Sequence, residues 1–189
     1  MQYFEQPPRV FPFRWIFPLG QLVLCMLLML IVVELRGNIP YVYAARVSEA
    51  ITAINLPGAL VQLPVALLFP DHEIWTPPWL TAQLWHGITF PIFTLVFWWI
   101  AGRATEALVA IDYCQLSPKI GWVETVTGFL VMAGGATILG GMLFGLSPSE
   151  RNESTRLAAG GGLWALLGAL SVIARFRQWR FTKKHKTII

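Results

Sequence analysis

The run WIFPLGQLVLCMLLMLIVVEL, from Trp15 to Leu35, decides the fold class of this chain. Its single formal charge, Glu34, lies next to its end. An α-helix rises about 1.5 Å per residue, so roughly 20 apolar residues cross a hydrocarbon core about 30 Å thick. The run is longer than the apolar region of a signal peptide, which has about 7–15 residues. We therefore expect a retained transmembrane helix over residues 15–35.

Three further apolar runs of comparable length follow, at Leu80–Ala101, Gly121–Leu143 and Leu157–Ala174. The composition agrees, because 56% of the residues are hydrophobic and 13% are charged, whereas soluble domains carry about 25% charged residues. Pro91 should kink the second run. The polar stretch Ser147–Thr155 predicts a short turn that makes the last two runs an antiparallel hairpin. The prediction is an all-α, four-helix transmembrane bundle in one membrane domain, residues 1–189.

The positions of lysine and arginine predict the orientation, since cytoplasmic loops are enriched in both. With spans at 15–35, 80–101, 121–143 and 157–174, cations gather on the side of the two chain ends. That side holds Arg9, Arg14, Arg103, Lys119, Arg175, Arg177, Arg180, Lys183, Lys184 and Lys186, and the opposite side holds Arg36, Arg46, Arg151 and Arg156. We expect both termini to be cytoplasmic, in the cell membrane or inner membrane.

The connection 37–79 is long but not polar. Tyr41–Asn55 fits a short amphipathic helix, with Val47 and Ile51 on its apolar face. The apolar stretch within 56–69 contains Pro64 and covers about half of the bilayer core. We expect an interfacial or re-entrant helical segment in this outer loop. A fifth span is the alternative, and it would place the basic tail outside.

Small residues crowd the last two runs. The positions expected in helix packing are Gly128, Gly135, Gly141, Gly145, Gly161 and Ala165. Small side chains let backbones approach closely, which drives helix association within a bilayer. These residues pack the hairpin against itself or, alternatively, form a face for a homo- or hetero-oligomer.

Polar residues within the apolar runs are candidates for a ligand or ion path. Glu124 lies about one turn inside the third run, while Gln83 and His86 lie in the second. A carboxylate inside a membrane is costly and can relay protons or bind cations. Near the end of a run, however, Glu124 can also reach the headgroups and be solvated there.

A metal site and a bound cofactor are not expected. Asp71, His72, Glu73 and His86 could supply imidazole and carboxylate ligands, but their spacing matches no ligand pattern. Cys25 and Cys114 fall on different parts of the chain, and the CxxC and CxxCH motifs are absent, so a covalent c-type haem, a zinc ribbon and thioredoxin-like redox chemistry are excluded.

The tail 175–189 interleaves basic and aromatic residues. Directly after a membrane span, attraction to anionic lipid explains this pattern more simply than nucleic-acid binding. The residues expected at the headgroups are Arg175, Arg177, Arg180, Lys183 and Lys184. The acidic surface of a partner protein is the alternative.

These features favour a non-enzymatic accessory or structural subunit of a membrane complex. The alternative is a small channel or transporter component that uses Glu124, His86 and Gln83. A further alternative is a membrane enzyme that acts at the outer face and uses Asp71, His72, Glu73 and His86.

Overall fold

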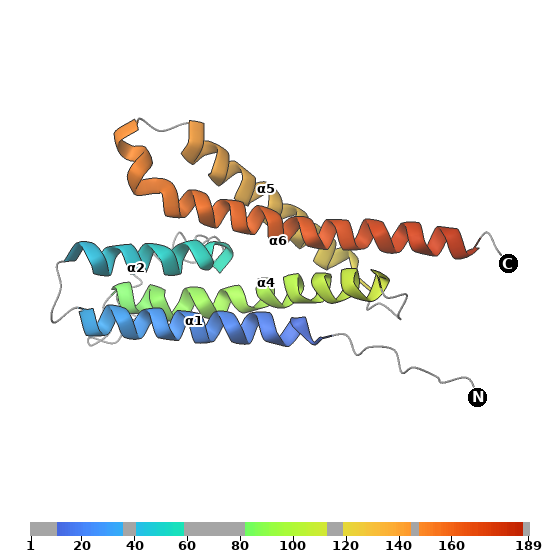
Figure 1. The fold of residues 1–189 in the computed structure, drawn as a ribbon, viewed down its shortest axis with the longest axis horizontal. Coiled ribbons are helices and arrows are strands. Elements are labelled where there is room, and N and C mark those ends of the chain that lie inside the picture. Colours follow the sequence, from blue (N-terminus) through green and yellow to red (C-terminus); the bar gives the residue numbers. More distant parts are fainter. Residues whose placement is uncertain (1–10, 36–40, 59–81, 113–118, 145–147, 187–189) are drawn as a thin grey trace, which may run out of the picture.

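The computed structural model describes residues 11–35, 41–58, 82–112, 119–144 and 148–186. Five helices lie in these ranges, and no strand does (Figure 1). They are α1 (Phe13–Leu35), α2 (Tyr41–Ile54), α4 (Ala82–Asp112), α5 (Trp122–Phe144) and α6 (Pro148–Lys186).

Four of these helices, α1, α4, α5 and α6, are long and apolar enough to cross a membrane. The prediction of an all-α bundle with four spans is confirmed, and the protein is membrane-embedded. Both α4 and α6 are longer than the apolar runs from which they were predicted. The helix of α4 continues unbroken through Pro91 and past Ala101 to Asp112, and α6 continues past Ala174 to Lys186.

The polar stretch Ser147–Thr155 was expected as a turn, but helix α6 already begins at Pro148. Proline suits the first position of a helix, because the N–H that it lacks would have no intrahelical partner there. The stretch is therefore mostly the first two turns of α6, and the hairpin connection is shorter than predicted.

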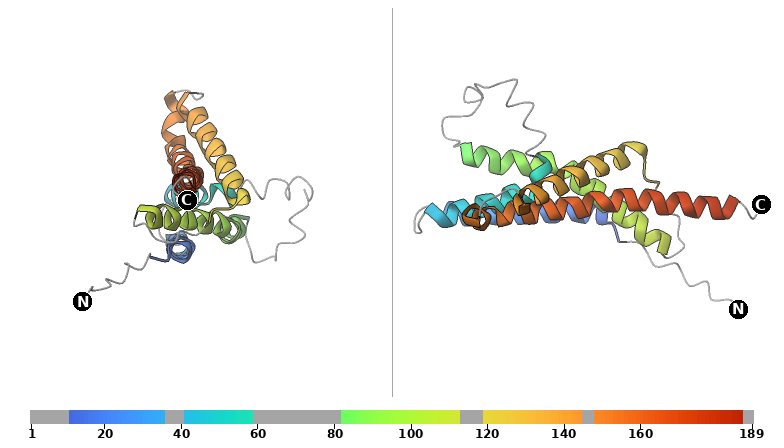
Figure 2. Two further views of the ribbon diagram at one scale, coloured as in Figure 1. Left: turned by 90° about the vertical axis from the view of Figure 1, so that its right-hand side faces the viewer. Right: turned by 90° about the horizontal axis from the view of Figure 1, so that it is seen from above.

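The helices form two pairs. Helix α1 packs along α4, and α5 packs along α6. Figures 1 and 2 show α4 between α1 and the α5–α6 hairpin. The start of α1 and the end of α6 lie at the same end of the bundle (Figure 1), as four crossings require. Because Arg14, Arg103, Lys119 and Arg175 gather there, we call it the basic end.

Helix α2 inserts into the bundle. Its bounds agree with the amphipathic helix predicted at Tyr41–Asn55, yet it contacts α1, α4 and α6 and is not confined to the surface. Ile51, Ala53 and the following residues 55–58 are buried. The segment enters from the end opposite the basic end and stops beside the middle of α1 (Figure 1). The apolar stretch for which an interfacial or re-entrant segment was predicted lies almost wholly in residues 59–81, outside the described part of the chain.

Close contact with α6 explains why α2 is drawn inward. A Cβ added to Gly160 would come within 2.8 Å of the Ala53 Cβ, so two small residues meet where the helices cross. The indole Nε1 of Trp164 donates to the Ala53 carbonyl oxygen at 3.2 Å. That bond satisfies a carbonyl near the end of α2, where no intrahelical donor follows.

Candidate functional site

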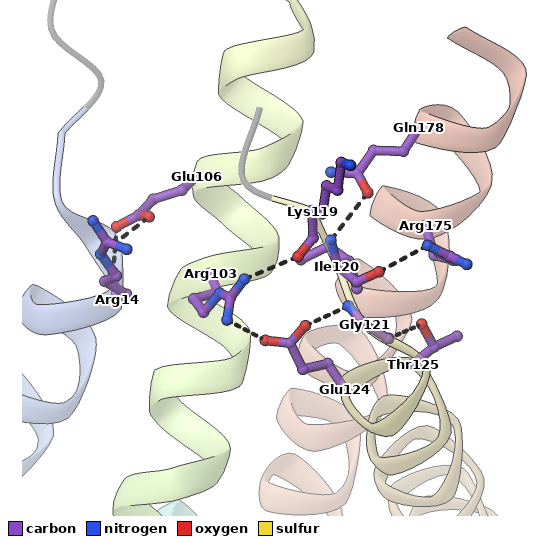
Figure 3. Close-up of polar contacts among 10 residues, drawn as sticks. All are labelled: Arg14, Arg103, Glu106, Lys119, Ile120, Gly121, Glu124, Thr125, Arg175 and Gln178. Carbon is purple, nitrogen blue, oxygen red and sulfur yellow. Dashed lines mark hydrogen bonds and ion pairs between the residues drawn. The ribbon is translucent and has the colours of Figure 1, made fainter. Parts of the chain in front are cut away.

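A polar network at the basic end joins the beginning of α5 to α4 (Figure 3). An Arg103 Nη1 lies 2.9 Å from Oε1 of Glu124, and Oε2 of Glu124 accepts the Gly121 N–H at 2.6 Å. Glu124 therefore caps the first turn of its own helix, where a negative charge also interacts favourably with the helix dipole.

Arg103 is held on two further sides. Its Nη2 donates to the Lys119 carbonyl oxygen at 2.9 Å, and its guanidinium lies 4.9 Å from the Trp99 ring centroid. This arrangement ties the backbone of Lys119 to α4 and leaves the Arg103 side chain only 22% exposed.

Helix α6 completes the network from the other side. Arg175 donates to the Ile120 carbonyl oxygen at 2.9 Å, and the Gln178 side chain accepts the Ile120 N–H at 3.1 Å. Ile120 itself is buried, with Ala104, Ala107 and Ala174 around it. The backbone just before α5 is therefore clamped between α4 and α6 (Figure 3).

A second carboxylate, Glu106, anchors α1 at the same end. Its Oε1 accepts the backbone N–H of Arg14 at 2.8 Å, and its Oε2 lies 3.6 Å from Arg14 Nε. Glu106 is 5% exposed, so it acts as an N-terminal cap for α1 that comes from another helix. Sequence reasoning missed it because residues after Ala101 were placed in a connection. Its partner Arg14 is 92 residues away in the sequence, so no local pattern indicates the contact.

The predicted path residues fall in different places. Glu124 lies in the first turn of α5 and is engaged by Arg103 and Gly121. Gln83 and His86 belong to α4, but their side chains lie outside the described part of the structure, as do Asp71, His72 and Glu73. Within the described ranges, no group of three His, Cys, Asp or Glu residues could hold a metal ion.

The middle of the bundle contains a polar cluster that was not predicted. It consists of Gln21 and Cys25 of α1, Thr94 of α4 and Asn55 at the end of α2, each at most 4% exposed. Gln21 Nε2 donates to Asn55 Oδ1 at 2.5 Å. Asn55 Nδ2 lies 3.2 Å from Cys25 Sγ and 2.7 Å from the Ile51 carbonyl oxygen.

Thr94 closes the cluster by donating to the Asn55 carbonyl oxygen at 3.2 Å. Buried polar groups in a bilayer need partners, because water is not available to them. The cluster thus binds the end of α2 to α1 and α4. Gln21 Oε1 is buried and has no hydrogen-bond partner in the described part of the chain. Two signals were available in the sequence: the amide of Gln21 in an apolar run, and Asn55 just before Leu-Pro-Gly.

Small residues form the contact between α5 and α6. A Cβ on Gly135 would lie 2.5 Å from the Gly161 carbonyl oxygen and 2.6 Å from the Ala165 nitrogen, and one on Gly128 would lie 2.6 Å from the Ser171 Cβ. Gly141, in contrast, is exposed and has nothing within 4 Å of its Cβ position, so it takes no part in this contact. Gly145 lies outside the described residues.

The basic tail is a continuation of α6. We call Gln178–Lys186 the α6 extension; it projects past the other helices in Figure 1. The side chains from Trp179 to Lys183 are all exposed. Arg180 lies over the Phe176 ring at 4.4 Å and Lys183 over the Trp179 ring at 4.1 Å, both at the i, i+4 spacing that supports a helix.

Comparison with protein families, with curated proteins and with solved structures gives no match.

Proposed function

We propose that this protein is a non-enzymatic accessory subunit of a membrane complex, and that the α6 extension docks a partner protein on the cytoplasmic side. The observation that carries the proposal is the unbroken course of α6 from the membrane through Lys186. The cytoplasmic placement rests on the bias of lysine and arginine toward the basic end. A reporter fused after Ile189 tests it, and activity of the reporter outside the cytoplasm would contradict it.

The distance that the α6 extension reaches beyond the membrane favours a protein partner for its last turns. Arg175 stands level with Arg103 and Glu124 (Figure 3). Nine residues later, Lys184 lies about 13 Å farther along the helix axis, while a headgroup layer is about 5–8 Å thick on each side. Contact with anionic headgroups therefore suits Arg175 and Arg177, and Lys183 and Lys184 reach beyond it.

The chemistry of the extension is that of a protein-binding helix. Trp179 is 52% exposed and Phe181 is 40% exposed, among basic neighbours. Tryptophan and arginine are enriched in the residues that dominate binding energy at protein interfaces. The complementary partner is an acidic surface with an apolar pocket for the indole ring.

Affinity purification of the full-length protein in mild detergent tests this proposal. Trp179→Ala combined with Arg180→Glu should lose a partner that the unchanged protein retains in stoichiometric amount. Trp122→Ala is the matched control, because Trp122 is 75% exposed on α5 at the same end, and it should retain the partner. A lone monomer for the unchanged protein, or equal retention by both variants, would contradict the proposal.

A transport component is the second candidate, favoured by the polar cluster where α2 ends inside the bundle. In transporters, half-helices that end near the bilayer midplane place carbonyl groups around ions. Flux through proteoliposomes should fall in Asn55→Leu if this candidate holds. Glu124→Gln tests the predicted path residue in the same assay, and equal flux in all variants would remove this candidate.

A further inference from the structure

An apolar groove of about 260 Å³ runs along the contact between α2 and α6. Its lining is formed by Ala50, Ala53 and Ile54 of α2 and by Ala159, Gly160 and Leu163 of α6. The small residues that let the two helices approach also leave the surface hollow beside the contact. Water gains no hydrogen bonds from such a lining, so an apolar chain is its suitable occupant.

One end of the groove is charged. Arg156 lines it there, and Arg156 Nη1 lies 2.5 Å from Oε2 of Glu49. The two side chains are 40% and 41% exposed, so both can still be reached from outside the protein. A guanidinium has five N–H donors, so Arg156 can contact Glu49 and a phosphate together.

The position of this ion pair fits a headgroup layer. Arg156 precedes Arg175 by nineteen residues of one continuous helix, which corresponds to about 28 Å along its axis. That length matches a hydrocarbon core of about 30 Å. If Arg175 marks one face of the core, Arg156 marks the other, and the groove runs from there along the acyl-chain region.

We propose that this groove binds one acyl chain of a phospholipid with a zwitterionic ammonium headgroup, whose phosphate contacts Arg156 and whose ammonium group contacts Glu49. The charge pattern selects this class. A cation and an anion side by side complement a dipolar headgroup, whereas Glu49 repels a headgroup that carries net negative charge. The site is independent of the α6 extension, which lies at the other end of the bundle.

Native mass spectrometry of the full-length protein, released from nanodiscs of phosphatidylethanolamine and phosphatidylglycerol in equal parts, tests the proposal. We expect retained phosphatidylethanolamine in excess of phosphatidylglycerol. Ala159→Phe fills the groove and should abolish the retention, while Leu166→Phe, at a 70% exposed position of α6 outside the groove, should leave it unchanged. Arg156→Gln should lower it about tenfold or more, because a charge-assisted hydrogen bond is lost.

Equal retention of the two lipids, or equal retention in Ala159→Phe and Leu166→Phe, would overturn the proposal. Cross-linking from the cysteine of the Ala159→Cys variant identifies which molecule or segment occupies the groove. Reaction with a lipid-borne probe supports the site, whereas dominant reaction with a second copy or with residues 59–81 would overturn it. Thermal unfolding of Ala159→Phe in detergent shows whether the variant is folded, and Arg156→Gln tests the headgroup contact without filling the groove.

Discussion

Gln21 of α1 and Asn55 at the end of α2 are joined by a side-chain hydrogen bond of 2.5 Å in the interior of the bundle. Both residues are nearly inaccessible, with 4% and 0% exposure. Polar side chains that bond between helices stabilise membrane bundles by about 0.6 kcal/mol on average and by up to about 2 kcal/mol. This pair therefore holds α2 inside the bundle.

Replacing one partner of this pair should cost more than replacing both. Asn55→Leu leaves the Gln21 amide buried without its acceptor, and we expect a loss of about 1–3 kcal/mol in the free energy of unfolding. In Gln21→Leu with Asn55→Leu the loss should be smaller than the sum of the two single losses. Unfolding in mixed detergent micelles measures all four proteins. Strict additivity would show that the two amides do not interact.

The depth of α2 predicts a steep change in cysteine accessibility. In a protein with Cys25→Ser and Cys114→Ser, Glu49→Cys should react readily with a membrane-impermeant maleimide, because that side chain is 41% exposed beside Arg156. Leu56→Cys should be protected, since Leu56 is 9% exposed in the bundle interior. Equal labelling rates at the two positions would place α2 on the surface.

Two neighbouring glycines of α5 should respond to alanine in opposite ways. Gly135→Ala places a methyl group 2.5 Å from the Gly161 carbonyl oxygen, so α5 and α6 must separate. We expect a loss of about 1–3 kcal/mol in the free energy of unfolding. Gly134→Ala meets nothing within 4 Å and should gain up to about 1 kcal/mol from helix propensity. Equal unfolding midpoints for the two variants would contradict the packing described.

The cap that Glu106 provides for α1 should depend on an acceptor oxygen more than on charge. Glu106→Gln retains an oxygen for the Arg14 N–H, whereas Glu106→Leu leaves that donor without its partner. We expect Glu106→Leu to lose about 1–2 kcal/mol more than Glu106→Gln. Thermal unfolding in detergent compares them. Similar melting temperatures would mean that water or lipid replaces the carboxylate.

The number of spans and the fold class were determined by the sequence alone. Whether a helix crosses a bilayer depends on its own apolar length, which the runs at 15–35 and 121–143 display without any knowledge of their neighbours. The amphipathic helix at 41–55 was also predicted from its own periodicity, and α2 ends one residue earlier. The lengths of α4 and α6 were not predicted. Both helices continue past their apolar runs, where Glu106 of α4 contacts Arg14 of α1 and Gln178 of α6 contacts Ile120 just before α5.

The insertion of α2 and both polar clusters were decided by the tertiary structure. Gln21 and Asn55 are 34 residues apart, and Arg14 and Glu106 are 92 apart, so no local pattern pairs them. A buried amide or carboxylate is tolerated only where another helix brings a partner to it. Helix packing, through small residues such as Ala53 and Gly160, determines which partners meet.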